Sequence, residues 1–149
     1  MKARIISIGK FKQEAYKSLF DEFAKRLKGG LELIELQEAK GEKAIKIGKE
    51  ADMLLNHCQA GYYRIALDAK GVMLDSIELA HHLEPYQNQG INILIGGADG
   101  LDPRILQHSD FTLSLGKLIW PHLLVRVMIA EQLYRAHSIL THHPYHRTH

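Results

Sequence analysis

Short apolar segments alternate with amphipathic ones along this 149-residue chain, and this alternation constrains the fold more than any other feature. The apolar segments are rich in Ile and Leu, and most of them stop at a glycine or a turn sequence, which is typical of strands. They cover residues 3–8, 31–36, 62–69, 91–95 and 111–115. Because strands that alternate with helices form parallel sheets with helices packed on their faces, the sequence predicts an α/β fold with a mostly parallel sheet and helices on both faces.

The segments between the strands carry helix signals, either apolar side chains every three or four residues or an Asp-Pro start. The expected helices cover residues 13–27, 47–58 and 76–83, a short segment from 102, and about 20 residues from 121. Residues 40–49 are charged and punctuated by glycine, so a solvated loop is expected before the second helix. Pro85 is expected to end the third helix. The third strand is expected to stop at Ala69, with a turn at Gly71.

The composition is that of one soluble globular domain spanning residues 1–149. Hydrophobic residues make up 46% and charged residues 24% of the chain, and the net charge is only +2. Any RNA contact therefore has to come from local patches or from two paired chains. The single cysteine, Cys58, cannot form an internal disulfide and is expected to pack in a helix. No apolar run has the length of a membrane span or a signal segment, so a cytoplasmic location is expected.

Two glycine-containing loops follow expected strands and are candidate ligand loops. In parallel sheets, ligands bind outside the carboxyl ends of the strands, which here follow Leu67, Ile95 and Leu115. The loop at residues 96–100 (GGADG) lacks the spacing of a dinucleotide fingerprint and of a phosphate-binding P-loop. It is either a tight strand-to-helix turn or a ligand loop, and the carboxylate of Asp99 would suit a cationic ligand.

The second loop, residues 116–121 (GKLIWP), is unusually apolar for a connection between a strand and a helix. Trp120 belongs either to the core or to an apolar slot whose backbone groups could read the edge of a flat ring such as adenine. Arg126, within the apolar sequence LLVRVMIA, needs a partner. It either pairs with a carboxylate such as Glu131, or one elsewhere, or faces a ligand carboxylate or phosphate.

The C-terminal tail from Thr141 is crowded with polar and aromatic groups. Its histidines are His142, His143, His146 and His149, but no second cluster with ligand spacing supports a metal site. A solvated, loose end is one alternative. The other is that Tyr145, His146 and Arg147 hold a nucleotide, because they combine a stacking ring, a group that titrates near neutrality and a phosphate-binding fork.

Several stretches resemble the RlmH family of ribosomal RNA methyltransferases, which belongs to the SPOUT class. The resemblance covers essentially the whole chain and is most specific in its last third. The stretches are ISIGK at 6–10, Leu67-Asp68, IGGADGL at 95–101, LSLGKLIWPHLLVRVMIAEQLYRA at 113–136 and HPYHR at 143–147.

The resemblance implies an α/β fold whose C-terminal segment forms a trefoil knot that binds S-adenosylmethionine. It also implies a homodimer that methylates N3 of a pseudouridine in the 23S rRNA of the assembled ribosome. The implied cofactor contacts are Leu67, Gly97, Gly116, Lys117, Leu118, Ile119, Trp120 and Pro121. His146, or a water that it holds, is expected to help remove the N3 proton, with Tyr145 stacking and Arg147 on phosphate. Arg126 is a secondary candidate for contacts at the dimer or RNA side.

Two other classes of function stay open. One is a ribosome-binding factor that keeps the fold but not the reaction, which would associate with ribosomes without transferring a methyl group. The other is a flavodoxin-like binder of a small molecule, which the missing phosphate loop disfavours.

Overall fold

The computed structural model describes residues 1–147, and these form a three-layer α/β arrangement. The strands are β1 (Ala3–Ile8), β2 (Leu31–Leu36), β3 (Tyr63–Met73), β4 (Ile91–Ile95) and β5 (Phe111–Ser114). The sheet order is β2-β1-β4-β3-β5, and every neighbouring pair is parallel. The predicted α/β fold and its parallel sheet are therefore confirmed.

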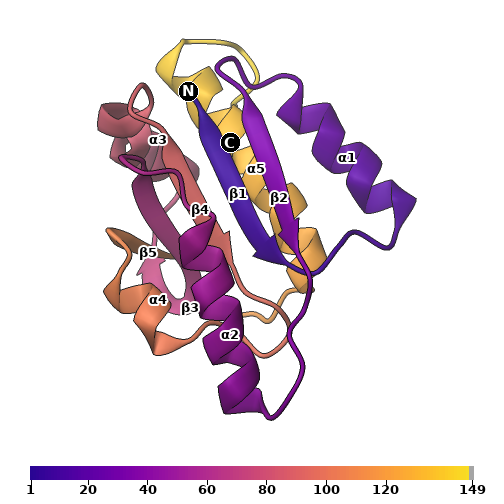
Figure 1. Cartoon of the computed structure of the whole chain (residues 1–149). Coiled ribbons are helices and arrows are strands. Elements are labelled where there is room, and N and C mark those ends of the chain that lie inside the picture. Colours follow the sequence, from indigo (N-terminus) through magenta and orange to yellow (C-terminus); the bar gives the residue numbers. More distant parts are fainter. Residues whose placement is uncertain (148–149) are drawn as a thin grey trace.

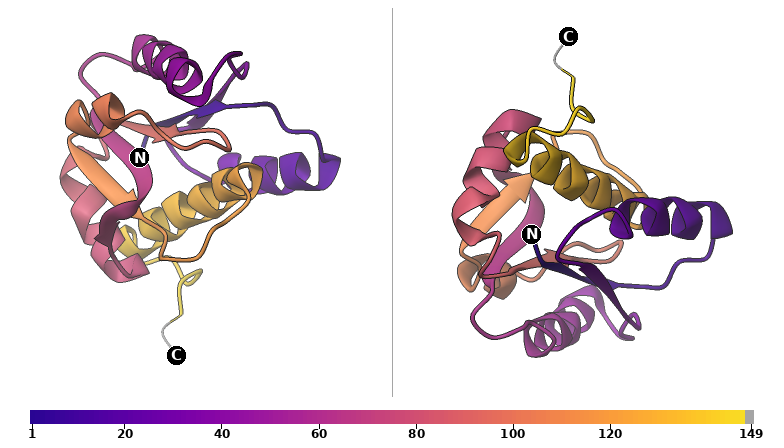
Figure 2. Two further views of the ribbon diagram at one scale, coloured as in Figure 1. Left: turned by 90° about the horizontal axis from the view of Figure 1, so that it is seen from below. Right: turned by 90° about the horizontal axis from the view of Figure 1, so that it is seen from above.

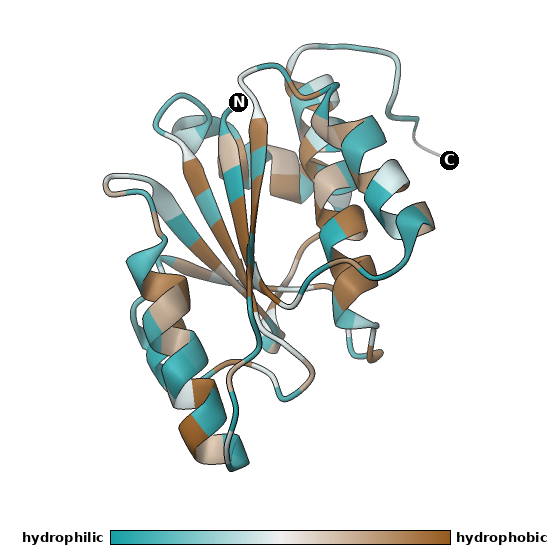
Figure 3. Cartoon of the chain, turned by 45° about the vertical axis from the view of Figure 1, so that its right-hand side comes forward, coloured by the Kyte–Doolittle hydropathy of each residue, from teal (hydrophilic) through white to brown (hydrophobic). Residues whose placement is uncertain are grey.

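Helices cover both faces of the sheet, as predicted (Figures 1 and 3). They are α1 (Glu14–Ala24), α2 (Lys43–Asn56), α3 (Ser76–Leu83), the 3-10 turn η1 (Glu84–Tyr86), α4 (Pro103–Gln107) and α5 (His122–Leu140). On one face α5 packs between α1 and α3 (Figure 2). On the other face lie α2 and α4. None of the helices in residues 1–147 is long and apolar enough to cross a membrane.

Two apolar cores follow from the alternation of side chains along buried strands. In β1, Ile5 points to the core shared with α1, α3 and α5, whereas Ile6 and Ile8 point to the smaller core beneath α2 and α4. All five residues of β4 are buried because that strand lies in the centre of the sheet. The short apolar run at 91–95 thus forms a central strand.

Two boundaries differ from the sequence prediction by four residues, and the other boundaries differ by less. Helix α2 begins at Lys43, so part of the expected charged loop at 40–49 is helix. The charges there occupy the polar side of α2, where Lys46 pairs with Glu38 and Asp99. Strand β3 continues to Met73 instead of stopping at Ala69.

The extension of β3 contains a bulge, and Gly71 lies in it rather than in a chain-reversing turn. Leu67 and Val72 both align with Leu113 of β5, so residues 68–71 leave the regular ladder. A Cβ atom at Gly71 would lie 2.6 Å from the carbonyl oxygen of Thr112. Glycine is therefore needed here for close backbone approach.

The starts and ends of two helices match their predicted signals. The Asp75 side chain caps α3 by accepting a 2.8 Å hydrogen bond from the Glu78 amide, and the Glu78 carboxylate accepts a 2.9 Å hydrogen bond from the Asp75 amide. Helix α3 ends at Leu83, and Pro85 lies in the 3-10 turn that follows. Helix α5 starts directly after Pro121, as expected.

Candidate functional site

A cavity of about 310 Å³ opens at the carboxyl ends of β3, β4 and β5, and we call it the slot. It is lined by Leu67, Asp68, Ala69, Ile95, Gly96, Gly97, Gly100, Leu101, Leu113, Leu115, Gly116, Lys117, Leu118, Ile119, Trp120, His122 and Val125. Of the eight residues that the resemblance implied as cofactor contacts, only Pro121 is not in this lining; it occupies the N-cap of α5. The sequence therefore placed a ligand site where the fold makes a cavity.

The loop after β4 is both a tight turn and a wall of the slot. The Gly100 amide donates a 3.1 Å hydrogen bond to the Gly97 carbonyl oxygen, which closes the turn. A Cβ at Gly96 would lie 2.8 Å from the Gly100 carbonyl oxygen, and one at Gly97 would lie 3.2 Å from Cγ2 of Ile8. The tight turn is thus confirmed, and it brings bare backbone to the slot; ligand binding by this loop stays a prediction.

Asp99 does not offer a free carboxylate to a cationic ligand. Lys46 of α2 donates a 2.7 Å hydrogen bond to its Oδ2, and this contact lowers the pKa of Asp99. Lys46 also pairs with Glu38, and the two contacts raise the lysine pKa. The ion pair between Asp99 and Lys46 therefore links the glycine loop to α2.

The loop from Gly116 to Pro121 carries its apolar side chains on the surface. Leu118 is 70% exposed, Ile119 is 99% exposed and Trp120 is 37% exposed. Trp120 donates from Nε1 to the Leu115 carbonyl oxygen over 3.4 Å. Placement of Trp120 in the core is therefore wrong, because it lies on the exposed rim of the slot. Exposed apolar groups beside a cavity are typical of a binding surface.

Arg126 is fully buried and links α5 to the carboxyl ends of β1 and β2. Its Nη1 donates to Oε2 of Glu35 over 2.9 Å, and its Nη2 donates to the carbonyl oxygens of Ile8 and Gly9 over 2.8 and 2.7 Å. Its ion pair is thus with Glu35 and not with Glu131. A role for Arg126 at the dimer or RNA side is wrong, because no part of its side chain reaches the surface.

His122 is a slot residue that the sequence gave little reason to single out. It lies one turn before Arg126 on α5, and its ring lines the slot. Burial lowers the pKa of His122, and the nearby charge of Arg126 lowers it further. The imidazole is therefore neutral around neutral pH. The sequence signal that could have identified His122 is its position, directly after Pro121 and four residues before Arg126.

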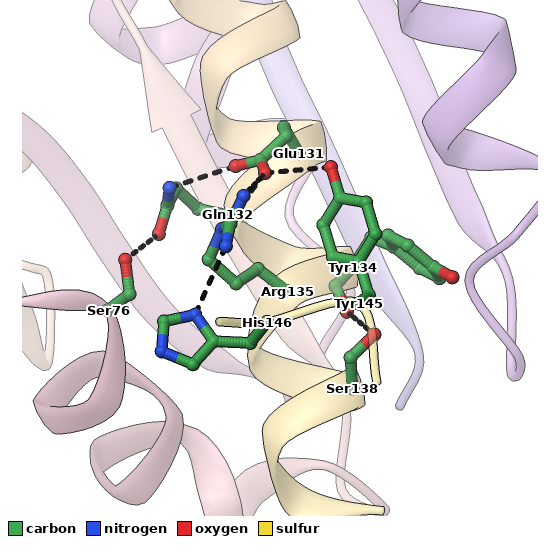
Figure 4. Close-up of polar contacts among 8 residues, drawn as sticks. All are labelled: Ser76, Glu131, Gln132, Tyr134, Arg135, Ser138, Tyr145 and His146. Atoms are coloured by element: carbon green, nitrogen blue, oxygen red, sulfur yellow. Dashed lines mark hydrogen bonds and ion pairs between the residues drawn. The ribbon is translucent and has the colours of Figure 1, made fainter. Parts of the chain in front are cut away.

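The tail packs against the second half of α5 through the cluster Glu131, Arg135, Tyr145 and His146 (Figure 4). Tyr145 donates its hydroxyl to Oε1 of Glu131 over 3.0 Å, and Arg135 donates from Nε to the same oxygen over 2.9 Å. The Arg135 guanidinium lies 4.9 Å from the centre of the Tyr145 ring. A loose, solvated end does not describe Tyr145 and His146, because these contacts hold both side chains against α5.

The remaining tail residues differ in how they are placed. His146 receives a 3.1 Å hydrogen bond from Arg135 at Nδ1, whereas its Nε2 is buried without a partner among the described residues. Arg147 is exposed, and His149 lies outside the described residues. Within residues 1–147, no group of three or more His, Cys, Asp or Glu side chains could hold a metal ion.

The tail cluster is not beside the slot of its own chain. Glu131 and Arg135 follow His122 by nine and thirteen residues on α5, roughly 14–20 Å along the helix axis. Between the two regions lies a second cavity of about 720 Å³, whose lining includes Met73, Ser114, Gly116, Met128 and Glu131. The expectation that the tail stands next to the loops is thus wrong within one chain, because α5 separates them.

A parallel α/β sheet with a glycine-walled slot at its carboxyl edge defines a class of ligand-binding α/β proteins, and comparison with known proteins narrows it. The family model described as "Predicted SPOUT methyltransferase" matches residues 1–146. The chain belongs to the SPOUT methyltransferase family, which confirms the family expected from the resemblance.

Relatives agree with this assignment along the full length. A protein of Rhizobium leguminosarum bv. trifolii named Ribosomal RNA large subunit methyltransferase H is 45% identical over 159 residues, covering 99% of each chain. A protein of Gluconacetobacter diazotrophicus with the same name is 40% identical over 146 residues, covering 97% of this chain and 96% of the relative. A probable methylase family protein from Haemophilus influenzae Rd KW20 has the same fold, with a TM-score of 0.63 at 15% identity, over 98% of this chain and 70% of that one.

Proposed function

We propose that this protein is an S-adenosylmethionine-dependent methyltransferase that methylates N3 of a pseudouridine in 23S rRNA of the large ribosomal subunit. One observation carries the proposal: in a chain of the SPOUT family, the bulge of β3 and the loops after β4 and β5 meet at one slot whose lining contains seven of the eight expected cofactor contacts. The relatives named Ribosomal RNA large subunit methyltransferase H support the rRNA substrate. Because these relatives are named as methyltransferases, they disfavour the alternative of a non-catalytic ribosome-binding factor.

The residues of the slot suit an adenosine-containing cofactor. Leu118, Ile119 and Trp120 offer apolar surface to a flat ring, and the backbone of Gly97 and Gly116 lies open to a bound molecule. Bound in the slot, the cofactor would supply the methyl group of its sulfonium centre. Transfer of this group requires that N3 be aligned with the methyl carbon and that a proton be removed from N3. We further propose that the segment through the slot belongs to a trefoil knot.

His146 is the proposed proton acceptor, and its surroundings define when it can act. An arginine N–H can only donate, so Nδ1 of His146 accepts from Arg135, and the neutral ring carries its proton on Nε2. In this arrangement the ring is a donor. His146 can accept the N3 proton, directly or through a water, only when Nδ1 is released from Arg135. Tyr145 would stack on the base and Arg147 would contact phosphate.

The separation of tail and slot is the reason to propose a homodimer in which the tail of one protomer faces the slot of its partner. The second cavity is bordered by apolar side chains that are partly exposed, including Leu19 at 45% and Met73 at 57%. A second copy of the chain would cover these groups. We propose one domain spanning residues 1–149, working on ribosomes in the cytoplasm.

Titration of the protein with S-adenosylmethionine tests the cofactor assignment. We expect calorimetric binding with a Kd on the order of micromolar, and a change in the emission of Trp120, the single tryptophan of the chain. Gly97→Val should abolish binding, because its side chain would collide with Ile8 and fill the slot wall. Gly48→Ala is the matched control, since a Cβ there makes only ordinary contacts at 3.8 Å inside α2.

A labelled-methyl assay on ribosomes tests the reaction. The methyl group should appear on 23S rRNA, and mass spectrometry of the rRNA should locate it on N3 of a pseudouridine. Absence of heat and of any emission change with the wild-type protein would refute the cofactor. Ribosome association without methyl incorporation would instead establish the non-catalytic factor.

A further inference from the structure

We propose that Ser114 is a positioning residue, whose hydroxyl holds two walls of the slot at the spacing that the cofactor needs. Ser114 is the last residue of β5 and is 4% exposed. Its Oγ lies 3.1 Å from the Ala69 carbonyl oxygen, 3.2 Å from the Gly116 carbonyl oxygen and 3.1 Å from the Gly116 amide nitrogen. The inference rests on the proposed function only in naming the cofactor as occupant of the slot.

The two partners of the hydroxyl belong to two different segments of the slot wall. Ala69 lies in the bulge of β3, where residues 68–71 leave the pairing with β5. Gly116 begins the apolar loop and has a φ of +105°, a conformation that favours glycine. Both residues line the slot, whereas Ser114 does not. The hydroxyl therefore stands behind the slot and joins its walls without facing the bound molecule.

The chemistry of one hydroxyl matches this role. Ser114 accepts a hydrogen bond from the Gly116 amide and has one proton to donate, either to the Ala69 or to the Gly116 carbonyl oxygen. Since residues 68–71 lack regular ladder bonds, the bond to Ala69 is a specific polar tie between the bulge and β5. Bulges next to binding sites aim the chain at a ligand, and this tie keeps the bulge in place.

Removal of the hydroxyl tests the inference without changing the slot lining. Ser114→Ala leaves the Gly116 amide without its partner, so the two walls should move apart. We expect the KM for S-adenosylmethionine to rise roughly tenfold while kcat at saturating cofactor stays within about twofold, because no group at the reacting atoms is removed. Ser114→Thr should restore most of the affinity, since it keeps the hydroxyl and the second cavity beside Ser114 has room for a methyl group.

Amide hydrogen exchange on the protein without ligand separates this inference from the proposed function. In Ser114→Ala, the amides of Gly116 and of residues 68–71 should exchange roughly tenfold faster, while those of the buried strand β4 stay unchanged. Ser109→Ala is the matched control: its hydroxyl donates to the Ile105 carbonyl oxygen over 2.6 Å, before β5 and outside the slot lining. It should change neither exchange at the slot nor affinity.

Unchanged exchange and unchanged affinity in Ser114→Ala would overturn the inference. Equal loss of affinity in Ser114→Ala and Ser114→Thr would also overturn it, because shape and not the hydroxyl would then matter. Faster exchange at the slot walls, with no cofactor binding even in the wild-type protein, would refute the proposed function and support the tie between the walls.

Discussion

The guanidinium of Arg126 shows how one residue holds the edge of the sheet on which the slot is built. It is fully buried, and its partners are the Glu35 carboxylate and the carbonyl oxygens at the end of β1. Burial lowers the pKa of Arg126, and the charge of Glu35 opposes this shift. A buried charge of this kind contributes little net free energy while paired but is costly to unpair. Its role is to fix where α5 begins relative to β1.

Replacement of this arginine by methionine should therefore destabilise the protein. Arg126→Met leaves Glu35 and the carbonyls of Ile8 and Gly9 without their donor, and we expect a loss of about 3–5 kcal/mol in the free energy of unfolding. Urea denaturation would measure it. Arg26→Ala is the control, because its ion pair with Glu22 is exposed to solvent and its loss should change the free energy of unfolding far less. Equal losses in the two variants would contradict this account of Arg126.

A second residue-scale prediction concerns pH and His82. Burial lowers the pKa of His82 below its usual 6.5, and its Nε2 pairs with the Tyr63 hydroxyl over 2.9 Å. The unfolded chain then binds a proton more readily than the folded one, so stability is complete above about pH 6.5 and falls as the pH drops below it. His82→Gln should weaken this acid dependence. Unfolding free energies between about pH 5 and pH 8 would check it, and an unchanged slope would count against the assignment.

At the scale of elements, α5 contacts the slot and the tail at separate places along its length. Its first turn borders the slot through His122, and its later turns hold the tail through Glu131 and Arg135. In these later turns the charges of Glu131 and Arg135 neutralise each other, and this allows the polar and aromatic tail to pack on the helix. This division predicts that the cofactor and RNA functions separate by mutation.

Truncation after Leu140 should abolish methyl transfer and leave cofactor binding within about twofold, because no residue between 126 and 147 lines the slot. Glu131→Gln is the milder variant. It keeps the tail but weakens its contacts with Tyr145 and Arg135, and it should reduce transfer partially. Calorimetry and the labelled-methyl assay measure the two functions. Full turnover by the truncated protein would show that the tail is not part of the reaction.

For the whole molecule, the central question is how slot and tail come together. Within one chain α5 holds them roughly 14–20 Å apart, so pairing of two copies offers a route that needs no change of fold. The partly exposed apolar groups Leu19 and Met73 border the second cavity between them. Such groups form the expected contact surface.

Leu19→Glu should shift the protein from dimer to monomer, since a carboxylate would be buried in that contact. Methyl transfer should fall with the dimer fraction, while each chain still binds the cofactor. Sedimentation equilibrium beside the methyl assay would show this. Ile45→Glu is the matched control, because Ile45 is 53% exposed on α2, across the sheet from the proposed contact. A monomeric wild-type protein with full activity would contradict the dimer.

The alternation of apolar strands and amphipathic helices, the glycine-containing loops and the Asp-Pro helix start were enough to predict the fold class and most of the elements. These features act locally, through backbone sterics and the period of buried side chains, so the sequence carries them directly. The same local logic placed the slot residues at strand ends. The local sequence did not predict the bulge and the extended end of β3, because the bulge depends on which strand lies beside Gly71.

What the sequence by itself determined was the parallel α/β fold and the loops that make the slot. What only the tertiary structure decided was pairing: Arg126 with Glu35 across 91 residues of chain, Asp99 with Lys46 across 53, and Ser114 with Ala69 across 45. These contacts depend on the spatial order of the strands and on how α5 crosses them. Arg126 and Ser114 are buried as well, and burial, which makes their hydrogen bonds stronger and more specific, is a property that the chain acquires only when it folds.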